Sequence, residues 1–164
     1  MNKFEFIPEK LILLSDTREK TNGNIKQYFE SKHITINETA LKSGDYSFIY
    51  DEIDYSNQFI IERKNSLSEL AGNFTHKRER FANEFNRIFP AGEKIVLVEH
   101  SGNGIADIKA GKYNVNFNPK AFIGSLLSFS YRYGIKFEFC PKNLFPEYMF
   151  QLIFYYIRDN YKTN

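Results

Sequence analysis

Short apolar runs of strand length alternate along this chain with longer segments whose apolar residues have helical spacing. The predicted strands are residues 10–16, 41–50, 58–64, 94–99 and 135–140. The predicted helices are residues 24–32, 66–89, 118–133 and 144–161. Strands that alternate with helices favour an α/β fold with a mixed central β-sheet flanked by helices. We expect one domain over residues 1–164, because this length is ordinary for a single domain.

Turn-forming and capping residues set the expected ends of these elements. Asn118 is suited to cap a helix, with Pro119 in its first turn, and Gly134 to end it. Pro90 ends the segment before it, which we expect to break around residues 72–73. The polar residues between the second and third strands form a loop. The Gly- and Asn-rich residues 101–116 form a longer loop with one helical turn.

The composition excludes several classes of protein. Cys140 is the only cysteine, so no internal disulfide can form, which fits a reducing, cytoplasmic location. The three histidines are scattered and leave no zinc-binding cluster. Residues 144–157 are too short for a membrane span and include Glu147 and Gln151. The abundance of Asn, Lys, Ile and Phe suggests an AT-rich genome, such as that of a low-GC bacterium or its phage. A net charge of +2 neither requires nor excludes nucleic acid.

The hairpin formed by the second and third predicted strands holds the most informative polar residues. Side chains alternate faces along a strand, so Glu62 and Lys64 share one face. If the turn is centred between Ile53 and Asp54, Asp45 lies opposite Glu62, with about 5 Å between their Cβ atoms. Two carboxylates this close repel each other unless a cation lies between them. A slip of one residue would place the two acids on opposite faces and remove the site.

A hard cation such as Mg²⁺ suits two adjacent carboxylates, because it prefers oxygen ligands. We therefore expect Asp45, Glu62 and the main-chain carbonyl of Arg63 to bind Mg²⁺, for which Mn²⁺ can substitute. The metal would activate a water molecule and neutralise charge on a phosphate. Lys64 would hold that water or help it to lose a proton. The alternative is that Asp45 caps a turn and that the other charges are solvated.

A second acid supports the metal-site interpretation. Asp16 also ends a buried strand, and Arg18 and Glu19 follow it. Acids at strand ends in an α/β domain tend to line one crevice. We expect Asp16 to bind the metal or to support its water. Arg18 and Arg63 would order the acids or hold phosphate.

These residues resemble the nuclease domain of the XPF-type structure-specific endonucleases. The matching segments are Asp16-Thr17-Arg18-Glu19, Gly44-Asp45, Ile61-Glu62-Arg63-Lys64, Arg80-Phe81 and Val96-Leu97-Val98-Glu99. Together with the last predicted strand and helix, they cover about residues 11–157. The resemblance implies a restriction-endonuclease-like fold and metal-dependent cleavage of branched or flapped DNA. The active-site set that it implies is Asp16, Arg18, Asp45, Glu62, Arg63 and Lys64.

Two departures from the family pattern bear on activity. The family usually has an Asp about four residues after the Lys, where this chain has Ser68. Glu69 is next to it and would compensate if the helix starts one residue later. Family members also often have a helix-hairpin-helix DNA-binding module, which we do not find in residues 1–164. A second hypothesis is therefore a catalytically weak or inactive subunit that binds DNA junctions or scaffolds a partner. A third is an RNA nuclease or a restriction-type enzyme.

Basic residues of the helix after the hairpin are candidates for DNA contact. Arg78, Arg80 and Lys77 could touch phosphates, and such contacts position DNA without reading its sequence. Arg80 also follows the family pattern. For Lys77 and Arg87 a solvated helix face is the preferred interpretation. The loop at residues 101–116 either approaches DNA through its amides and lysines or is a plain connector.

The last predicted helix has apolar residues on more than one face. Met149 and Ile153 recur at helical spacing, but Phe150, Phe154 and Tyr155 fill other faces. One contact with a core does not need so wide an apolar surface. Aromatic residues are enriched in subunit interfaces, and members of the resembled family form dimers through this region. We therefore expect a homodimer through this C-terminal helix, with stacking on unpaired bases as the alternative.

Overall fold

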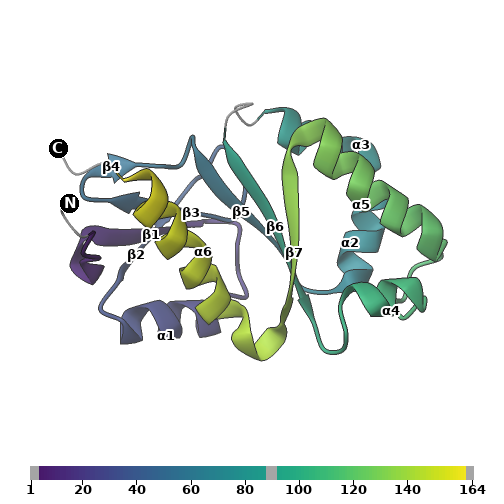
Figure 1. The fold of residues 1–164 in the computed structure, drawn as a ribbon, viewed down its shortest axis with the longest axis horizontal. Helices are drawn as coiled ribbons and strands as arrows, with labels where there is room; N and C mark the ends of the chain where they lie inside the picture. The colour runs from purple at the N-terminus through teal and green to yellow at the C-terminus, as the bar shows by residue number, and fades with distance from the viewer. Residues whose placement is uncertain (1–3, 88–91, 162–164) are drawn as a thin grey trace.

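The computed structural model describes residues 4–87 and 92–161 (Figure 1). The strands of its single mixed sheet are β1 (Leu11–Asp16), β2 (Thr35–Thr39), β3 (Tyr46–Tyr50), β4 (Ile53–Asp54), β5 (Phe59–Lys64), β6 (Glu93–His100) and β7 (Ile135–Pro141). The α-helices are α1 (Gly23–Ser31), α2 (Leu67–Phe74), α3 (Arg78–Asn86), α4 (Ile105–Lys109), α5 (Pro119–Tyr133) and α6 (Phe145–Asn160). Short 3₁₀ helices, η1 (Pro8–Lys10) and η2 (Lys142–Leu144), precede β1 and α6. Within the described residues, no helix has the length and apolar character needed to cross a membrane.

The strands are ordered β2-β1-β3-β5-β6-β7 across the sheet, and β4 pairs with β3. β1 is parallel to β2, and β5, β6 and β7 are parallel to one another. β3 lies between these two groups and is antiparallel to both β1 and β5. The carboxyl ends of β1, β5 and β6 and the start of β3 therefore meet at one edge of the sheet. The candidate site lies at this edge.

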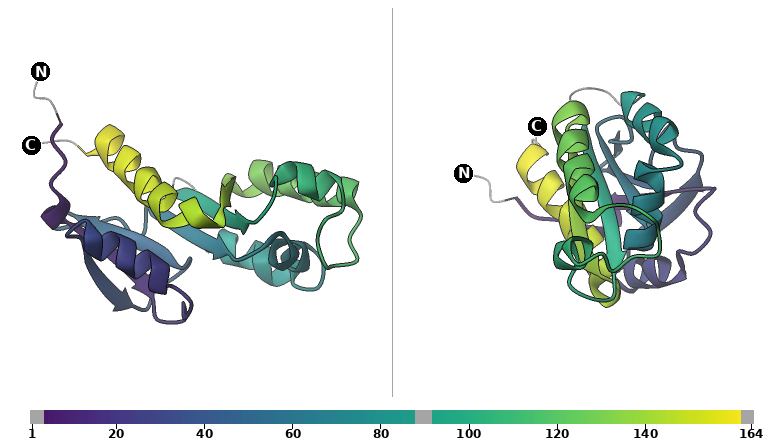
Figure 2. Two further views of the ribbon diagram at one scale, coloured as in Figure 1. Left: turned by 90° about the horizontal axis from the view of Figure 1, so that it is seen from below. Right: turned by 90° about the vertical axis from the view of Figure 1, so that its right-hand side faces the viewer.

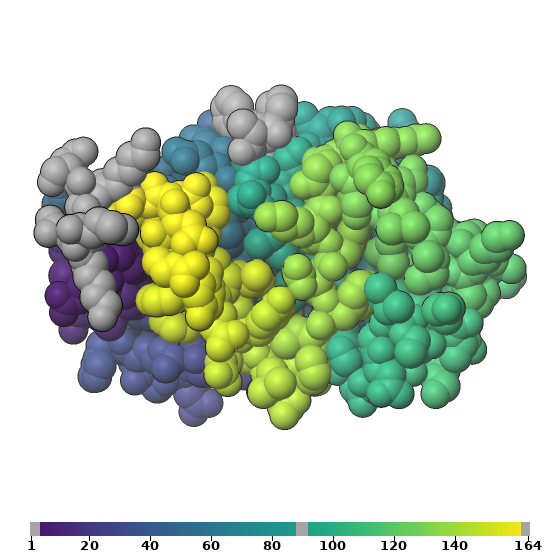
Figure 3. Space-filling view, in the orientation of Figure 1, coloured from purple at the N-terminus to yellow at the C-terminus, as the bar shows by residue number. Residues whose placement is uncertain are grey.

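Helices cover both faces of the sheet, and each face has its own hydrophobic core. α1 and α6 pack on one face, where Leu13, Phe29 and Ile153 are fully buried. α2, α3 and α5 pack on the other face, around Phe81 and Phe122. Figure 2 shows α1 and α6 at one end of the molecule and the other helices at the opposite end. On the face seen in Figure 3, α6 and α5 stand apart, and a groove of about 330 Å³ lies between α6 and β7.

Most predicted elements are confirmed to within one or two residues, including the division of residues 66–89 into two helices, but the second predicted strand starts too early, and β2 and β4 were not predicted. Residues 41–45 are not part of a strand, because β3 begins at Tyr46. β2 was not predicted, since its sequence is polar and mostly exposed at the edge of the sheet and so lacks apolar alternation. The break between α2 and α3 follows Phe74 rather than residues 72–73. Residues 88–90, with the predicted helix end, lie outside the described residues.

The hairpin that carries the predicted acids turns at a different place from the one expected. Asp51 and Glu52 form the tight turn, with φ values of +49° and +67°, and Tyr50 pairs with Ile53. A second turn follows β4, in which the Gln58 N–H donates to the Tyr55 carbonyl (2.8 Å). This turn contains the additional residues between β4 and β5. The predicted turn centre is therefore wrong. The predicted register is nevertheless confirmed where β3 meets β5, because Tyr46 is opposite Ile61 there.

Candidate active site

Asp45 is held between two strands at the edge where β3 begins. Its backbone N–H donates to the Ile61 carbonyl of β5 (2.9 Å), and its carbonyl accepts from the Asp16 N–H of β1 (2.8 Å). The pair Tyr46–Ile61 continues in this register, so Asp45 comes beside Glu62. Main-chain hydrogen bonds thus gather three acids from neighbouring strands at one place.

Gly44 allows the chain to approach β5 this closely. Its φ is +75°, a conformation that a side chain would strain. A Cβ atom on this residue would lie 3.1 Å from the Ile60 Cβ and 3.2 Å from the Ile61 carbonyl oxygen. A larger residue would therefore push the chain away from β5. The glycine is part of the geometry that orients Asp45.

Asp45 and Glu62 are two carboxylates in a partly enclosed site. Oδ2 of Asp45 accepts a hydrogen bond from the Arg63 N–H (2.8 Å). Burial, followed by the charge of Glu62, raises the pKa of Asp45 to about 8. Burial also raises the pKa of Glu62, although the neighbouring Lys64 counteracts it. The two acids therefore resist being ionised together near neutral pH, and a cation beside them would relieve this.

Lys64 lies on the same face as Glu62, as strand alternation predicts. Its Nζ donates to Oε1 of Glu62 (2.8 Å) and lies 3.9 Å from Oε1 of Glu69. Burial lowers the pKa of Lys64, but the charge and hydrogen bond of Glu62 outweigh it and leave the pKa raised. Lys64 is therefore a fixed ammonium group, which can hold a water molecule or an anion. It is poorly suited to take up a proton.

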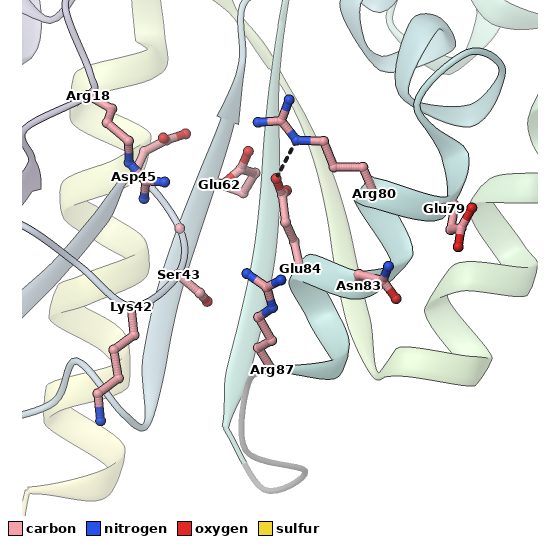
Figure 4. Close-up of a pocket in the computed structure, with 11 residues that line it drawn as sticks. Arg18, Lys42, Ser43, Asp45, Glu62, Glu79, Arg80, Asn83, Glu84 and Arg87 are labelled. Atoms are coloured by element: carbon pink, nitrogen blue, oxygen red, sulfur yellow. Dashed lines mark ion pairs between the residues drawn. The ribbon is translucent and has the colours of Figure 1, made fainter.

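Asp16 is engaged by hydrogen bonds at both carboxylate oxygens. Oδ1 accepts from the N–H and Nε of Arg18 (2.9 and 2.6 Å), and Oδ2 accepts from the Leu41 N–H (2.8 Å). Burial would raise the pKa of Asp16, but these hydrogen bonds outweigh it and lower the pKa. Asp16 is buried, whereas the Arg18 side chain is exposed. Asp16 thus fixes the Arg18 guanidinium, which lies beside Asp45 in Figure 4.

The side chain of Arg63 points to the opposite face of the sheet from Glu62. Its Nε donates to Oε1 of Glu99 (2.7 Å), its Nη1 donates to the Thr21 carbonyl (2.6 Å), and its guanidinium lies over the Phe145 ring. Both members of the Arg63–Glu99 ion pair are almost completely buried. The guanidinium therefore does not reach the two acids, and the geometry does not support phosphate contact by this side chain. Only the main chain of Arg63 takes part in the site.

A cavity of about 570 Å³ opens beside the two acids, between the loop that precedes β3 and helix α3 (Figure 4). Its lining residues are Arg18, Lys42, Ser43, Gly44, Asp45, Glu62, Glu79, Arg80, Asn83, Glu84 and Arg87. Arg80 lies 3.7 Å from Glu84 on the same helix. The cavity therefore brings the two predicted carboxylates together with two of the predicted arginines, Arg18 and Arg80.

Lys42, Glu84 and Arg87 also line this cavity, although none of them was predicted to belong to the site. Arg80, Glu84 and Arg87 recur at helical spacing, which places them on one side of α3. This spacing indicated that Glu84 and Arg87 lie on the same side of the helix as Arg80. No such pattern marked Lys42, because its position depends on how the loop before β3 folds.

Residues 15–148, more than half of the chain, match the ERCC4 domain. The chain belongs to the ERCC4 domain family. No curated protein matches it. The ERCC4 domain is similar to the structure of XPF from Aeropyrum pernix, with a TM-score of 0.64 and 16% identity, over 93% of this chain and 62% of that one. It is also similar to XPF from Aeropyrum pernix in complex with DNA, with a TM-score of 0.64 and 15% identity, over 93% and 68% of the two chains.

These similarities confirm two expectations about the ERCC4 domain. The mixed sheet with helices on both faces is the restriction-endonuclease-like fold that the resemblance implied. The family match and the fold together identify an XPF-type nuclease domain. The chain spans 62% of the length of the first XPF structure.

Several predicted residues of the ERCC4 domain lie outside the cavity. Lys77 is exposed where α3 begins. Arg78 donates to Oγ of Ser125 (2.9 Å) and lies over the Phe129 ring, so it is tied to α5. Of Lys77, Arg78 and Arg80, only Arg80 lines the cavity.

Ser68, at the place of the family Asp, has a structural contact instead. Its Oγ accepts from the Asn114 N–H (2.9 Å), which ties the loop before α5 to α2. Glu69 accepts from the Asn65 N–H (2.7 Å) at the start of α2 and lies near Lys64. Glu69 therefore lies within ion-pair distance of Lys64 but does not line the cavity.

The donor set of the ERCC4 domain fits a hard divalent cation at Asp45 and Glu62. Within residues 4–87 and 92–161, no three His, Cys, Asp or Glu side chains are placed to hold a metal together. Oδ1 of Asp45 and Oε2 of Glu62 accept no hydrogen bond from these residues. Two such carboxylate oxygens, completed by main-chain oxygen and water, are ligands that Mg²⁺ accepts.

Proposed function

We propose that this ERCC4 domain is a metal-dependent endonuclease that hydrolyses phosphodiester bonds in branched or flapped DNA. The observation that carries the proposal is the group of Asp45, Glu62 and Lys64 beside an open cavity walled by arginines. The family match supports nuclease chemistry, and the XPF structure in complex with DNA supports DNA as the substrate.

Asp45, Glu62 and the main-chain carbonyl of Arg63 would hold Mg²⁺, with Mn²⁺ as a substitute. The Arg63 N–H donates to Asp45. Because the N–H and the carbonyl of one strand residue point to the same side of the strand, the Arg63 carbonyl would face the same side. When bound, the cation supplies positive charge that stabilises the scissile phosphate and activates the attacking water. Asp16 stays a supporting acid in this proposal, because its oxygens are occupied by Arg18 and an amide.

The other residues of the site would position the reactants. Lys64, fixed by Glu62, would hold the attacking water or stabilise negative charge that develops near it. Arg18 would bind a phosphate oxygen next to Asp45, because Asp16 already fixes its guanidinium. Arg80 would bind a second phosphate from α3.

The test is cleavage of labelled duplex, splayed-arm, flap and four-way DNA with Mg²⁺, Mn²⁺ or EDTA, beside an Asp45→Asn control. We expect metal-dependent cutting of the branched forms, lost by at least about 100-fold in the control because a metal ligand is removed. Equal cutting by the Asp45→Asn protein would refute the proposed site. Matched RNA substrates separate a DNA enzyme from an RNA enzyme.

A DNA-junction-binding or scaffold subunit is the second candidate. The observation that favours it is Ser68, which has a structural contact where the family has an acid. Tight binding of junctions by the purified chain, with no cutting under any of these metals, would support this candidate over the enzyme.

We also propose a homodimer with an intracellular location, where its DNA substrate lies. The dimer was predicted partly from Phe150 and Phe154, but both residues contact Phe6 within the chain. Tyr155 supports the dimer, because it is half exposed beside the groove between α6 and β7. Sedimentation of the parent and of Tyr155→Arg tests this proposal. A parent that sediments as a monomer at micromolar concentration would contradict it.

A further inference from the structure

We propose that Lys42 and Arg87 hold backbone phosphates that neighbour the scissile phosphate, from opposite walls of the cavity. The inference rests on the proposed function and adds two substrate-positioning residues to it. Lys42 belongs to the loop before Asp45, and Arg87 ends helix α3. Figure 4 shows both at the end of the cavity that is farther from Arg18.

One side of α3 forms a wall of the cavity along its length. Arg80, Glu84 and Arg87 project from this side, whereas Phe81 and Phe85 are buried in the core behind it. Arg80 and Arg87 are seven residues apart, which is about 10 Å along a helix. Since each DNA strand has a phosphate about every 3.4 Å along its axis, arginines with this spacing reach different phosphates.

The cations of the cavity differ in whether they have acidic partners. Arg18 is bound to Asp16 (2.6 Å), and Arg80 lies 3.7 Å from Glu84. Lys42 and Arg87 form no ion pair with any residue in 4–87 or 92–161. Both are exposed. Their charge is therefore available to an anion that enters the cavity, whereas a phosphate at Arg80 competes with Glu84.

The lining also indicates which part of the DNA the cavity contacts. Among the described residues that line it, none has an aromatic or aliphatic side chain. Proteins that hold unpaired bases do so largely by stacking them on aromatic rings. Lysine and arginine at phosphates position DNA whatever its sequence. The ligand of Lys42 and Arg87 is therefore the phosphodiester backbone rather than the bases.

The test is the double substitution Lys42→Gln and Arg87→Gln, assayed by steady-state cleavage of a labelled flap substrate. We expect KM to rise at least about 10-fold with kcat within about 3-fold, because a contact that is equally strong in the ground state and the transition state affects KM and not kcat. Affinity is then measured in the Asp45→Asn background at several salt concentrations. Loss of two phosphate contacts should reduce the slope of log affinity against log salt by about 1.4 for a single strand or about 1.8 for duplex. Single-stranded and duplex oligonucleotides in separate arms show which is held.

The matched control is Lys120→Gln with Arg132→Gln, which removes one lysine and one arginine from exposed positions on α5 outside the cavity. It should leave KM and the slope unchanged. A parental KM and slope in the Lys42/Arg87 variant, with a parent that cuts, would overturn this inference and leave the proposed function intact. If the parent does not cut, the proposed function fails, and an unchanged binding slope would still overturn the inference. If the double variant melts below the parent, the single substitutions serve as the test, each with about half the change in slope.

Discussion

At the residue scale, the site is built on an acid whose backbone is hydrogen-bonded on both sides. The N–H and carbonyl of Asp45 are bound to strands on either side, so its carboxylate is kept beside Glu62. Burial and the second acid raise its pKa to about 8, which means that the charged form is unfavourable in the metal-free chain. The pair of carboxylates that would attract a divalent cation therefore destabilises the fold when no cation is bound.

This arrangement predicts how the Asp45→Asn variant melts in EDTA. The pKa of Asp45 is higher in the folded chain, at about 8, than its ordinary value of 3.8. The folded parent therefore holds the proton more tightly, and its stability falls as the pH rises between these values. Asn does not titrate, so the variant should melt increasingly above the parent from about pH 4 to about pH 8. The difference should reach at least about 3 °C, which is at least on the order of 1 kcal/mol for a domain of this size.

Thermal melts of the two proteins across this pH range check the expectation. Added Mg²⁺ should raise the melting temperature of the parent and leave that of the variant unchanged, because only the parent keeps both carboxylates. A temperature difference that stays constant with pH would contradict the account.

The sequence allowed part of this site to be predicted, and the reasons differ among residues. Glu62 and Lys64 followed from strand alternation, and the structure confirms that they share a face. The same alternation turns Arg63 to the opposite face, but the family pattern assigned it a role whatever its direction. Lys42 could not be predicted, because packing of the loop before β3 brings it to the cavity. Arg87 was assigned to a solvated helix face, although its helical spacing from Arg80 indicated the same side of the helix.

At the scale of the elements, the buried pair Arg63–Glu99 joins β5 to β6 beneath α6. The guanidinium also lies 5.1 Å from the centre of the Phe145 ring, at the start of α6. Glu99 is the residue before the last of β6, the strand next to β5, so the pair keeps the carboxyl ends of the two strands together. The main chain that binds Asp45 belongs to this same segment, so the pair supports the site without touching it.

Glu99→Gln should lower the free energy of unfolding by about 3 kcal/mol, because it removes the nearer carboxylate from the buried charge of Arg63. The more distant Glu19, 3.7 Å from Arg63, remains. Glu93→Gln is the matched control, since it removes an ion pair with Lys136 that is partly exposed and also joins two neighbouring strands. The control should cost less than about 1 kcal/mol. Urea denaturation measures both. Equal losses of free energy of unfolding would show that burial does not make the Arg63–Glu99 pair more stabilising than the partly exposed pair.

The fold was predictable wherever an element buries an apolar face. α5 begins and ends as predicted, with Asn118 accepting hydrogen bonds from two amides and Gly134 in the left-handed conformation. β2 was missed because an exposed edge strand needs no apolar alternation. The turn at residues 51–52 was missed because Asp51 and Glu52, rather than glycine, adopt positive φ there.

At the scale of the whole molecule, the junction between β3 and β5 divides the sheet into two parts. β5 pairs with β6 along its whole length, but in the described residues the register of β3 with β5 is a single pair, Tyr46 with Ile61. The core beneath α1 and α6 contains residues from both parts, such as Phe48 of β3 and Phe59 of β5, whereas the core beneath α2, α3 and α5 belongs to one part. Asp45 lies on one side of this junction and Glu62 on the other.

Amide hydrogen exchange tests whether this junction opens locally. We expect the Asp45 and Arg63 amides to exchange at least about 10-fold faster than amides between β5 and β6, because fewer hydrogen bonds must break. Mg²⁺ should slow them in the parent but not in Asp45→Asn. Exchange that is equally slow across both junctions would contradict the expectation.

A site that straddles the least paired junction of its sheet is sensitive to heat in a particular way. A small local opening of the β3–β5 pairing at this edge increases the distance between the acids while the rest of the molecule stays folded. Catalysis should then be lost reversibly below the melting temperature, and a bound cation would act as a cross-link that raises the temperature at which this happens.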